Sequence, residues 1–154
     1  MNLELEPIRN VAEQVVSIYR KELENKGINA SSNLSKTASA TVELNGKHLI
    51  VYLELDHYWK YVEYGRRAGK MPPVDKIKEW IRVKPIIPNP INGKIPDTKQ
   101  LAFLIARKIG REGFEGKHPI ENITNSSAIK SVIDDITNEI MNQLKQQLID
   151  GVKQ

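Results

Sequence analysis

The chain has 154 residues, of which 40% are hydrophobic and 27% are charged, and its formal net charge is +4. This length and composition predict a single domain, residues 1–154, with a buried core, and they argue against an intrinsically disordered chain. No apolar run approaches the roughly 20 residues of a membrane-spanning helix, and the absence of cysteine excludes disulfides and thiolate metal sites.

The N-terminal segment, MNLELEPIRN, lacks the charged and then apolar pattern of a signal peptide. We therefore expect synthesis in the cytoplasm and no membrane partner. The three histidines, His48, His57 and His118, have no metal-ligand spacing. The sequence accordingly predicts no metal site and no cofactor.

The positive charge is concentrated in the middle of the chain. Residues 57–118 hold fourteen Lys/Arg and six Asp/Glu, a net charge of +8, whereas residues 1–56 and 119–154 each carry −2. A basic middle with acidic flanks is typical of nucleic-acid binding. It is equally typical of self-association, in which the basic face of one copy meets the acidic face of another.

The first half of the chain predicts a helix, a loop and a hairpin. Apolar residues recur at helical spacing over residues 6–26, and the Asn25-Lys26-Gly27 sequence predicts the helix end. Residues 28–37, rich in Asn and Ser, are expected to form a loop. Asn45-Gly46 predicts a two-residue type I′ turn. With that turn Val42 pairs with Leu49, Ala40 with Val51 and Ala38 with Leu53, on one apolar face.

The next segment predicts two short helices around a basic loop. Asp56 is expected to cap a helix that ends at Gly65. Residues 66–71, RRAGKM, are expected to form an exposed loop. Pro72-Pro73 then opens a second helix, which Lys84-Pro85 ends.

The last third predicts a long connection and two further helices. Residues 84–96 contain four prolines and form an extended loop that includes a possible edge segment at Ile86-Ile87. Asp97 and Gln100 form a capping box for a helix that ends near Gly110 or Gly113. Residues 111–126 are expected to be a polar loop. A final helix after Ser126 or Ser127 keeps one apolar face for about six turns, which we expect to cover the hairpin.

The expected fold class is therefore α+β. An antiparallel hairpin packs against the N-terminal helix and the long C-terminal helix, with shorter helices between them.

Catalytic chemistry has little support in the sequence. The glycines of Gly65-x-x-x-Gly69-Lys70-Met71 are one residue too close for a phosphate-binding loop, and Met71 replaces the magnesium-binding hydroxyl. Glu63 is a candidate acid or base without a partner motif. We predict no catalytic residues and no enzyme.

Two binding hypotheses fit the basic loop. Arg66, Arg67 and Lys70 lie beside several tyrosines, a mixture that single-stranded nucleic acids favour. Tyrosine, tryptophan and arginine also dominate protein–protein hot spots.

Residues Tyr61–Pro73, YVEYGRRAGKMPP, followed by Ile77 and Trp80-Ile81, resemble a family motif. The motif has the form Y-V-E-x-G-x-R, then a Gly/Lys/Pro-rich loop, then I-x-x-W-[VI]. It is similar to that of tailed-bacteriophage neck proteins, the head–tail joining or tail-completion subunits. The motif covers about residues 58–81, and the order of elements agrees over most of the chain.

The resemblance implies a structural virion protein of the neck. Such a subunit forms a homo-oligomeric ring between portal and tail, around the DNA channel, with copies of itself and adjacent neck or tail proteins as partners. The extra length after Trp80, in the proline-rich segment 84–96 and the following helix, leaves open which neck layer the chain occupies.

We expect the basic loop to contact a neighbouring subunit or the DNA in the channel, through Arg66, Arg67, Gly69 and Lys70. We expect a second set of residues to brace that loop: Trp59, Tyr61, Gly65, Pro72, Pro73 and Trp80. The alternative hypothesis is a stand-alone basic nucleic-acid-binding protein.

Overall fold

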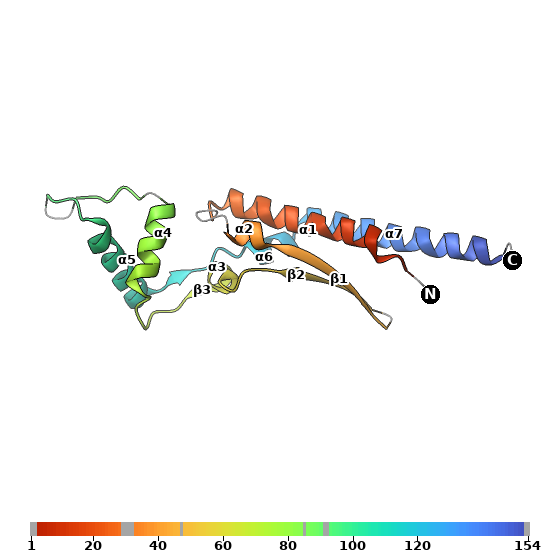
Figure 1. The fold of residues 1–154 in the computed structure, drawn as a ribbon, viewed down its shortest axis with the longest axis horizontal. Coiled ribbons are helices and arrows are strands. Elements are labelled where there is room, and N and C mark those ends of the chain that lie inside the picture. Colours follow the sequence, from red (N-terminus) through yellow and green to blue (C-terminus); the bar gives the residue numbers. More distant parts are fainter. Residues whose placement is uncertain (1–2, 29–32, 47, 85, 91–92, 153–154) are drawn as a thin grey trace.

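The computed structural model describes residues 3–28, 33–46, 48–84, 86–90 and 93–152. The chain forms an elongated α+β structure, shown in Figure 1. Its helices are α1 (Leu5–Asn25), α2 (Asn33–Thr37), α3 (Trp59–Tyr64), α4 (Val74–Val83), α5 (Thr98–Glu112), α6 (Pro119–Thr124) and α7 (Ser127–Val152). Its strands are β1 (Ser39–Asn45), β2 (His48–Glu54), β3 (Gly65–Arg66) and β4 (Phe114–Glu115). Within the described ranges, no helix is both long and apolar enough to cross a membrane.

Helix α1 lies where the sequence predicts it and ends in a Schellman motif. Gly27, at φ +61°, donates its N–H to Glu24 O, and Ile28 donates to Leu23 O. Leu23 is fully buried and Ile28 packs against the same hydrophobic cluster. The apolar contact across the motif fixes the direction in which the chain leaves the helix.

The β1–β2 hairpin has the predicted apolar face but not the predicted register. Asn45 pairs with His48, Val42 with Val51 and Ala40 with Leu53. The last pair before the turn is therefore Asn45 with His48, and each residue of β1 pairs two positions further along β2 than expected. Because side chains alternate with a period of two, this displacement leaves the same residues on the same face.

The hydrophobic core lies between α1, the hairpin and the C-terminal helices. One cluster includes Tyr19, Leu34 and Ile123, and a second joins Ile8, Ala12 and Val42 to Ile136 and Ile140 of α7. Helix α7 runs beside α1 and continues past its N-terminal end (Figure 1). The predicted stripe therefore reaches the hairpin through Ile136 and Ile140, but much of α7 lies along α1 instead.

Three short elements occupy segments expected to be loops. Residues 33–37 form α2, which buries Leu34, and the predicted loop 111–126 contains β4 and α6. Residues 29–32 lie outside the described part. Pro119 at the first position of α6 and the buried Ile123 were the signals for that helix, but six residues are too few for a convincing period.

Asp56 also differs from its predicted role. The structure shows no side-chain cap on α3, whose N-cap residue is Tyr58. Asp56 instead contributes its backbone carbonyl, which accepts a hydrogen bond from Trp59 N–H at 2.9 Å. The helix starts from a backbone turn.

Two chain segments cross closely where β3 pairs with β4. Gly65 ends α3 at φ 75°, ψ −157°, and Gly113 ends α5 at φ 69°, ψ −159°. Only glycine adopts this region readily. A Cβ on Gly65 or Gly113 would lie well under 3.0 Å from a backbone oxygen of the other segment, and one on Gly116 would meet Glu63 O. We call this arrangement of Gly65, Gly113 and Gly116 the glycine crossing.

Helices α4 and α5 pack on each other and form a separate lobe at one end of the molecule (Figure 1). We call residues 65–113 the arm and the rest of the chain the body. Ile81, Ala102 and Ala106 are buried in the arm. The capping box at Asp97 and Gln100 is present as predicted, and α5 ends at Gly113. Residues 86–90 form no strand, so the edge segment at Ile86-Ile87 is absent.

Tyr19 is the largest fully buried side chain of the core, and its hydroxyl has no hydrogen-bond partner within the described ranges. Burial raises the pKa of this phenol, and the nearby Glu63 carboxylate and Tyr58 raise it further. The folded protein therefore retains a proton that the unfolded chain releases in alkali.

We expect the free energy of unfolding to fall as pH rises above the ordinary tyrosine pKa of about 10, because only the unfolded state loses the Tyr19 proton there. Tyr19→Phe should make this fall shallower and should cost little at neutral pH, where the missing hydroxyl leaves no partner unpaired. Urea unfolding across the alkaline range measures it. Tyr61→Phe, at a half-exposed site, is the control, and equal alkaline slopes for wild type and Tyr19→Phe would contradict the account.

Candidate functional site

The basic loop between α3 and α4 is exposed, as predicted, except at its base. Arg67, Gly69 and Lys70 are exposed. Arg66 is half-buried in β3, where it pairs with Phe114, and its guanidinium donates to Lys70 O. Gly69 N–H donates to Gly110 O at 2.7 Å. The loop is thus held by its own Arg66 and by the end of α5.

The residues predicted to brace the loop occupy different places. Trp59 packs against the core of the body, whereas Trp80 and Tyr61 are 39% and 52% exposed and line a hollow between arm and body. Pro72 is buried and Pro73 is the N-cap of α4. Gly65 belongs to the glycine crossing. The structure brings Gly65 and the prolines next to the loop, and it adds Gly110, which the sequence did not indicate.

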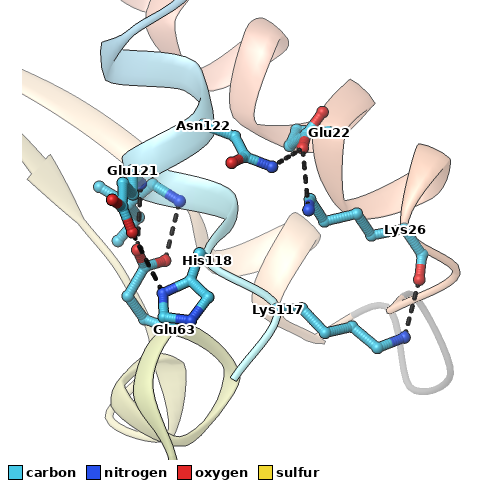
Figure 2. A network of polar contacts seen from close by, with 8 residues as sticks. Glu22, Lys26, Glu63, Lys117, His118, Glu121 and Asn122 are labelled. Atoms are coloured by element: carbon cyan, nitrogen blue, oxygen red, sulfur yellow. Dashed lines mark hydrogen bonds and ion pairs between the residues drawn. The ribbon is translucent and has the colours of Figure 1, made fainter. Parts of the chain in front are cut away.

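Glu63 is buried at 3% exposure, and its carboxylate caps helix α6. Ile120 N–H donates to Oε2 at 2.8 Å and Glu121 N–H donates to Oε1 at 3.0 Å. Figure 2 shows these bonds at the start of the helix. The main-chain oxygens of Val62 and Glu63 accept from Lys117 and His118 N–H, at 2.8 and 3.3 Å. A carboxylate also suits the positive end of a helix.

A second part of the network ties α6 to the end of α1 (Figure 2). Asn122 Nδ2 donates to Glu22 Oε1 at 3.0 Å, and Lys117 Nζ donates to Lys26 O at 2.8 Å. The chain that returns from the arm is therefore fixed to α3 and to α1.

Glu63, His118 and Glu121 bring potential metal-ligand atoms within 4.8 Å of one another. Each Glu63 oxygen already accepts a backbone N–H, and His118 Nδ1 lies 3.3 Å from Glu121 Oε2. The two backbone donors account for the position of Glu63, the candidate acid or base, without an ion.

The surface of the described residues includes an inter-lobe hollow and an apolar groove. The first, of about 320 Å³, lies between arm and body and is lined by Tyr58, Tyr61, Trp80 and Phe114 with Lys84 and Lys117 at its edge. The second, of about 280 Å³, is an apolar groove between β2, α6 and α7. Its residues include Val51, Ile133 and Ile136, and we call it the body groove. Sequence patterns gave no sign of either, because each needs elements far apart in the chain.

Charge divides between the two parts of the molecule. The arm holds twelve Lys/Arg and four Asp/Glu, a net charge of +8, so the remaining residues carry −4. The basic excess of the middle third is thereby placed on one projecting lobe. Such a distribution favours an acidic partner for the arm and a basic one for the body.

No protein-family model, curated protein or solved structure matches the chain. The phage neck family therefore stays a prediction from the motif.

We predict that Glu63→Gln lowers the free energy of unfolding by about 2–3 kcal/mol, because it removes a buried, charged acceptor of two N–H groups. Urea unfolding measures the loss. Glu121→Gln, which alters an exposed carboxylate, should cost under about 0.5 kcal/mol. Full stability of Glu63→Gln would contradict the capping role and return this carboxylate to consideration as an acid or base.

Proposed function

We propose that the protein is a structural subunit of a tailed-bacteriophage neck, in which copies form a ring between portal and tail around the DNA channel. In this proposal it performs no catalysis, binds no cofactor and resides in the virion. The observation that carries the proposal is the separation of a basic arm from an acidic body, joined by the segment that resembles the neck motif.

Roles found for the motif residues support a structural subunit. Glu63 caps α6, Gly65 permits the crossing, and Pro72-Pro73 lead into α4. These roles build and orient the arm. They explain why the motif combines glycine, proline and a carboxylate without any catalytic arrangement.

Opposite charge on two different surfaces also supports ring formation. A contact between unlike surfaces of identical subunits is heterologous, and it produces a ring when the rotation between subunits closes. The +8 arm and −4 body supply such surfaces on one chain. Exposed apolar residues in both parts add to the contact, among them Val83 and Phe103 in the arm and Val51 and Ile133 in the body.

Nucleic-acid binding is the second candidate, favoured by the exposed side of the basic loop. Arg67 and Lys70 are exposed close in sequence to Tyr64, which is 69% exposed. Cations contact phosphates and exposed aromatic rings stack on bases. This arrangement fits a stand-alone binding protein, and it fits equally a ring whose loop faces DNA.

The oligomeric mass of the protein and its retention of DNA, measured together, distinguish the neck ring from the stand-alone nucleic-acid-binding protein. We expect the purified protein to form closed rings at high concentration, seen by light scattering and in negatively stained images. Two results together would contradict the ring proposal: a protein that stays monomeric at every concentration, and a DNA affinity that falls steeply with salt. For about six phosphate contacts, the affinity should fall on the order of 10³-fold between about 50 and 200 mM salt. Arg67→Glu with Lys70→Glu should then abolish retention.

A further inference from the structure

An exposed aromatic side chain stands on the arm outside its packed face. Phe103 of α5 is 46% exposed, whereas Ala102 and Ala106 on the inner face of the same helix are fully buried. The Arg107 guanidinium lies 6.0 Å from the centre of the Phe103 ring. Phenylalanine beside arginine has the composition of an interface anchor.

The body groove is an apolar depression, in contrast to the exposed side chain of Phe103. Val51 and Ile133 at its surface are 36% and 57% exposed, although neighbouring residues of its lining, such as Val132, are buried. The hairpin, α6 and the first part of α7 thus leave an apolar depression unfilled. Its volume of about 280 Å³ is enough for one aromatic side chain.

Charges around the two surfaces are complementary. Strand β2, α6 and α7 supply most of the groove lining, and together they carry six carboxylates and two lysines, a net charge of −4: Glu54, Glu121, Asp134, Asp135, Glu139 and Asp150 against Lys130 and Lys145. Of these, Glu54 lies on the other face of the hairpin, where the Ser39 and Thr41 hydroxyls donate to it. Phe103 lies between Lys99 and Arg107-Lys108 on α5. An aromatic side chain on a basic helix is therefore complementary in net charge to an apolar depression formed by acidic elements.

We propose that Phe103 in the arm of one copy docks into the body groove of a second copy. This inference rests on the proposed homo-oligomer and names its subunit contact. Each copy would use its arm once and its groove once, which is the heterologous contact that a ring needs. Arg107 and Lys108 would then approach the carboxylates of the neighbouring body.

Site-specific cross-linking tests the contact, because the chain has no cysteine and each introduced thiol is unique. One variant carries Arg107→Cys, one helical turn from Phe103, which stays in place, and a second, distinguished by a size tag, carries Ile133→Cys. The two are mixed and oxidised at high concentration. We expect the mixed disulfide at least about tenfold in excess over either homodimer, since docking raises the effective concentration of only that pair.

The matched control replaces Ile133→Cys with Leu148→Cys, on the same helix at a site that is 71% exposed. This control should give only the background yield. Equal yields from the two pairings would overturn the docking proposal, and an excess of the Ile133→Cys homodimer would replace it with a groove-to-groove contact. Circular dichroism checks the fold of each variant.

Two further measurements distinguish failure of the docking contact from failure of the proposed function. Wild-type rings without the favoured disulfide would overturn the docking contact alone, whereas neither rings nor disulfide would overturn both. Duplex DNA is added in a parallel sample. If DNA protects the thiol of Arg107→Cys from alkylation and no mixed disulfide forms, the arm binds nucleic acid and the docking proposal is wrong.

Discussion

The close approach of two backbones at the glycine crossing determines how the two parts of the molecule join. Helices α3 and α5 both end in a glycine whose backbone lies in a region closed to other residues, and each glycine faces the main chain of the other segment. A β-carbon at either position would push the segments apart. The β3–β4 pairing and the hydrogen bond from Gly69 to Gly110 exist because the segments can approach this closely.

The same crossing explains the buried carboxylate. Once the chain has returned from the arm past Gly116, Lys117 and His118 meet the oxygens of Val62 and Glu63, and α6 begins over the Glu63 side chain. The chain order Val62, Glu63, Gly65 therefore specifies three consecutive contacts with one returning strand. The segment that resembles the neck motif in the sequence therefore holds the arm to the body in the structure.

The glycine crossing also separates the basic part of the molecule from the acidic part. In sequence, the basic residues form a broad excess over the middle third. In the structure they occupy a lobe that projects from an acidic body at one end of the molecule, far from both termini (Figure 1). This separation of charge does not add to the packing of the hydrophobic core. It suits a chain that associates with another molecule.

Local features were predictable from the sequence and distant pairings were not. The end of α1 at Gly27 and the capping box of Asp97 and Gln100 depend on residues a few positions apart. The hairpin has the expected apolar face although its pairs are displaced by two residues, because side-chain alternation determines the face and an even displacement leaves it unchanged. The Glu63–Ile120 bond and the contact of Gly65 with Phe114 join residues about fifty positions apart, and no periodic pattern encodes them.

Glycine replacement at the crossing tests the central claim most directly. Gly113→Ala is compared with Gly27→Ala, whose φ of +61° is also positive but whose added Cβ would meet nothing within 4 Å. Urea unfolding, followed by the fluorescence of Trp59 in the body and Trp80 in the arm, reports both parts. We expect Gly27→Ala to cost about 1–2 kcal/mol from backbone strain alone, and Gly113→Ala to cost more than about 3 kcal/mol because strain and backbone overlap add. Equal losses for the two variants would contradict the account.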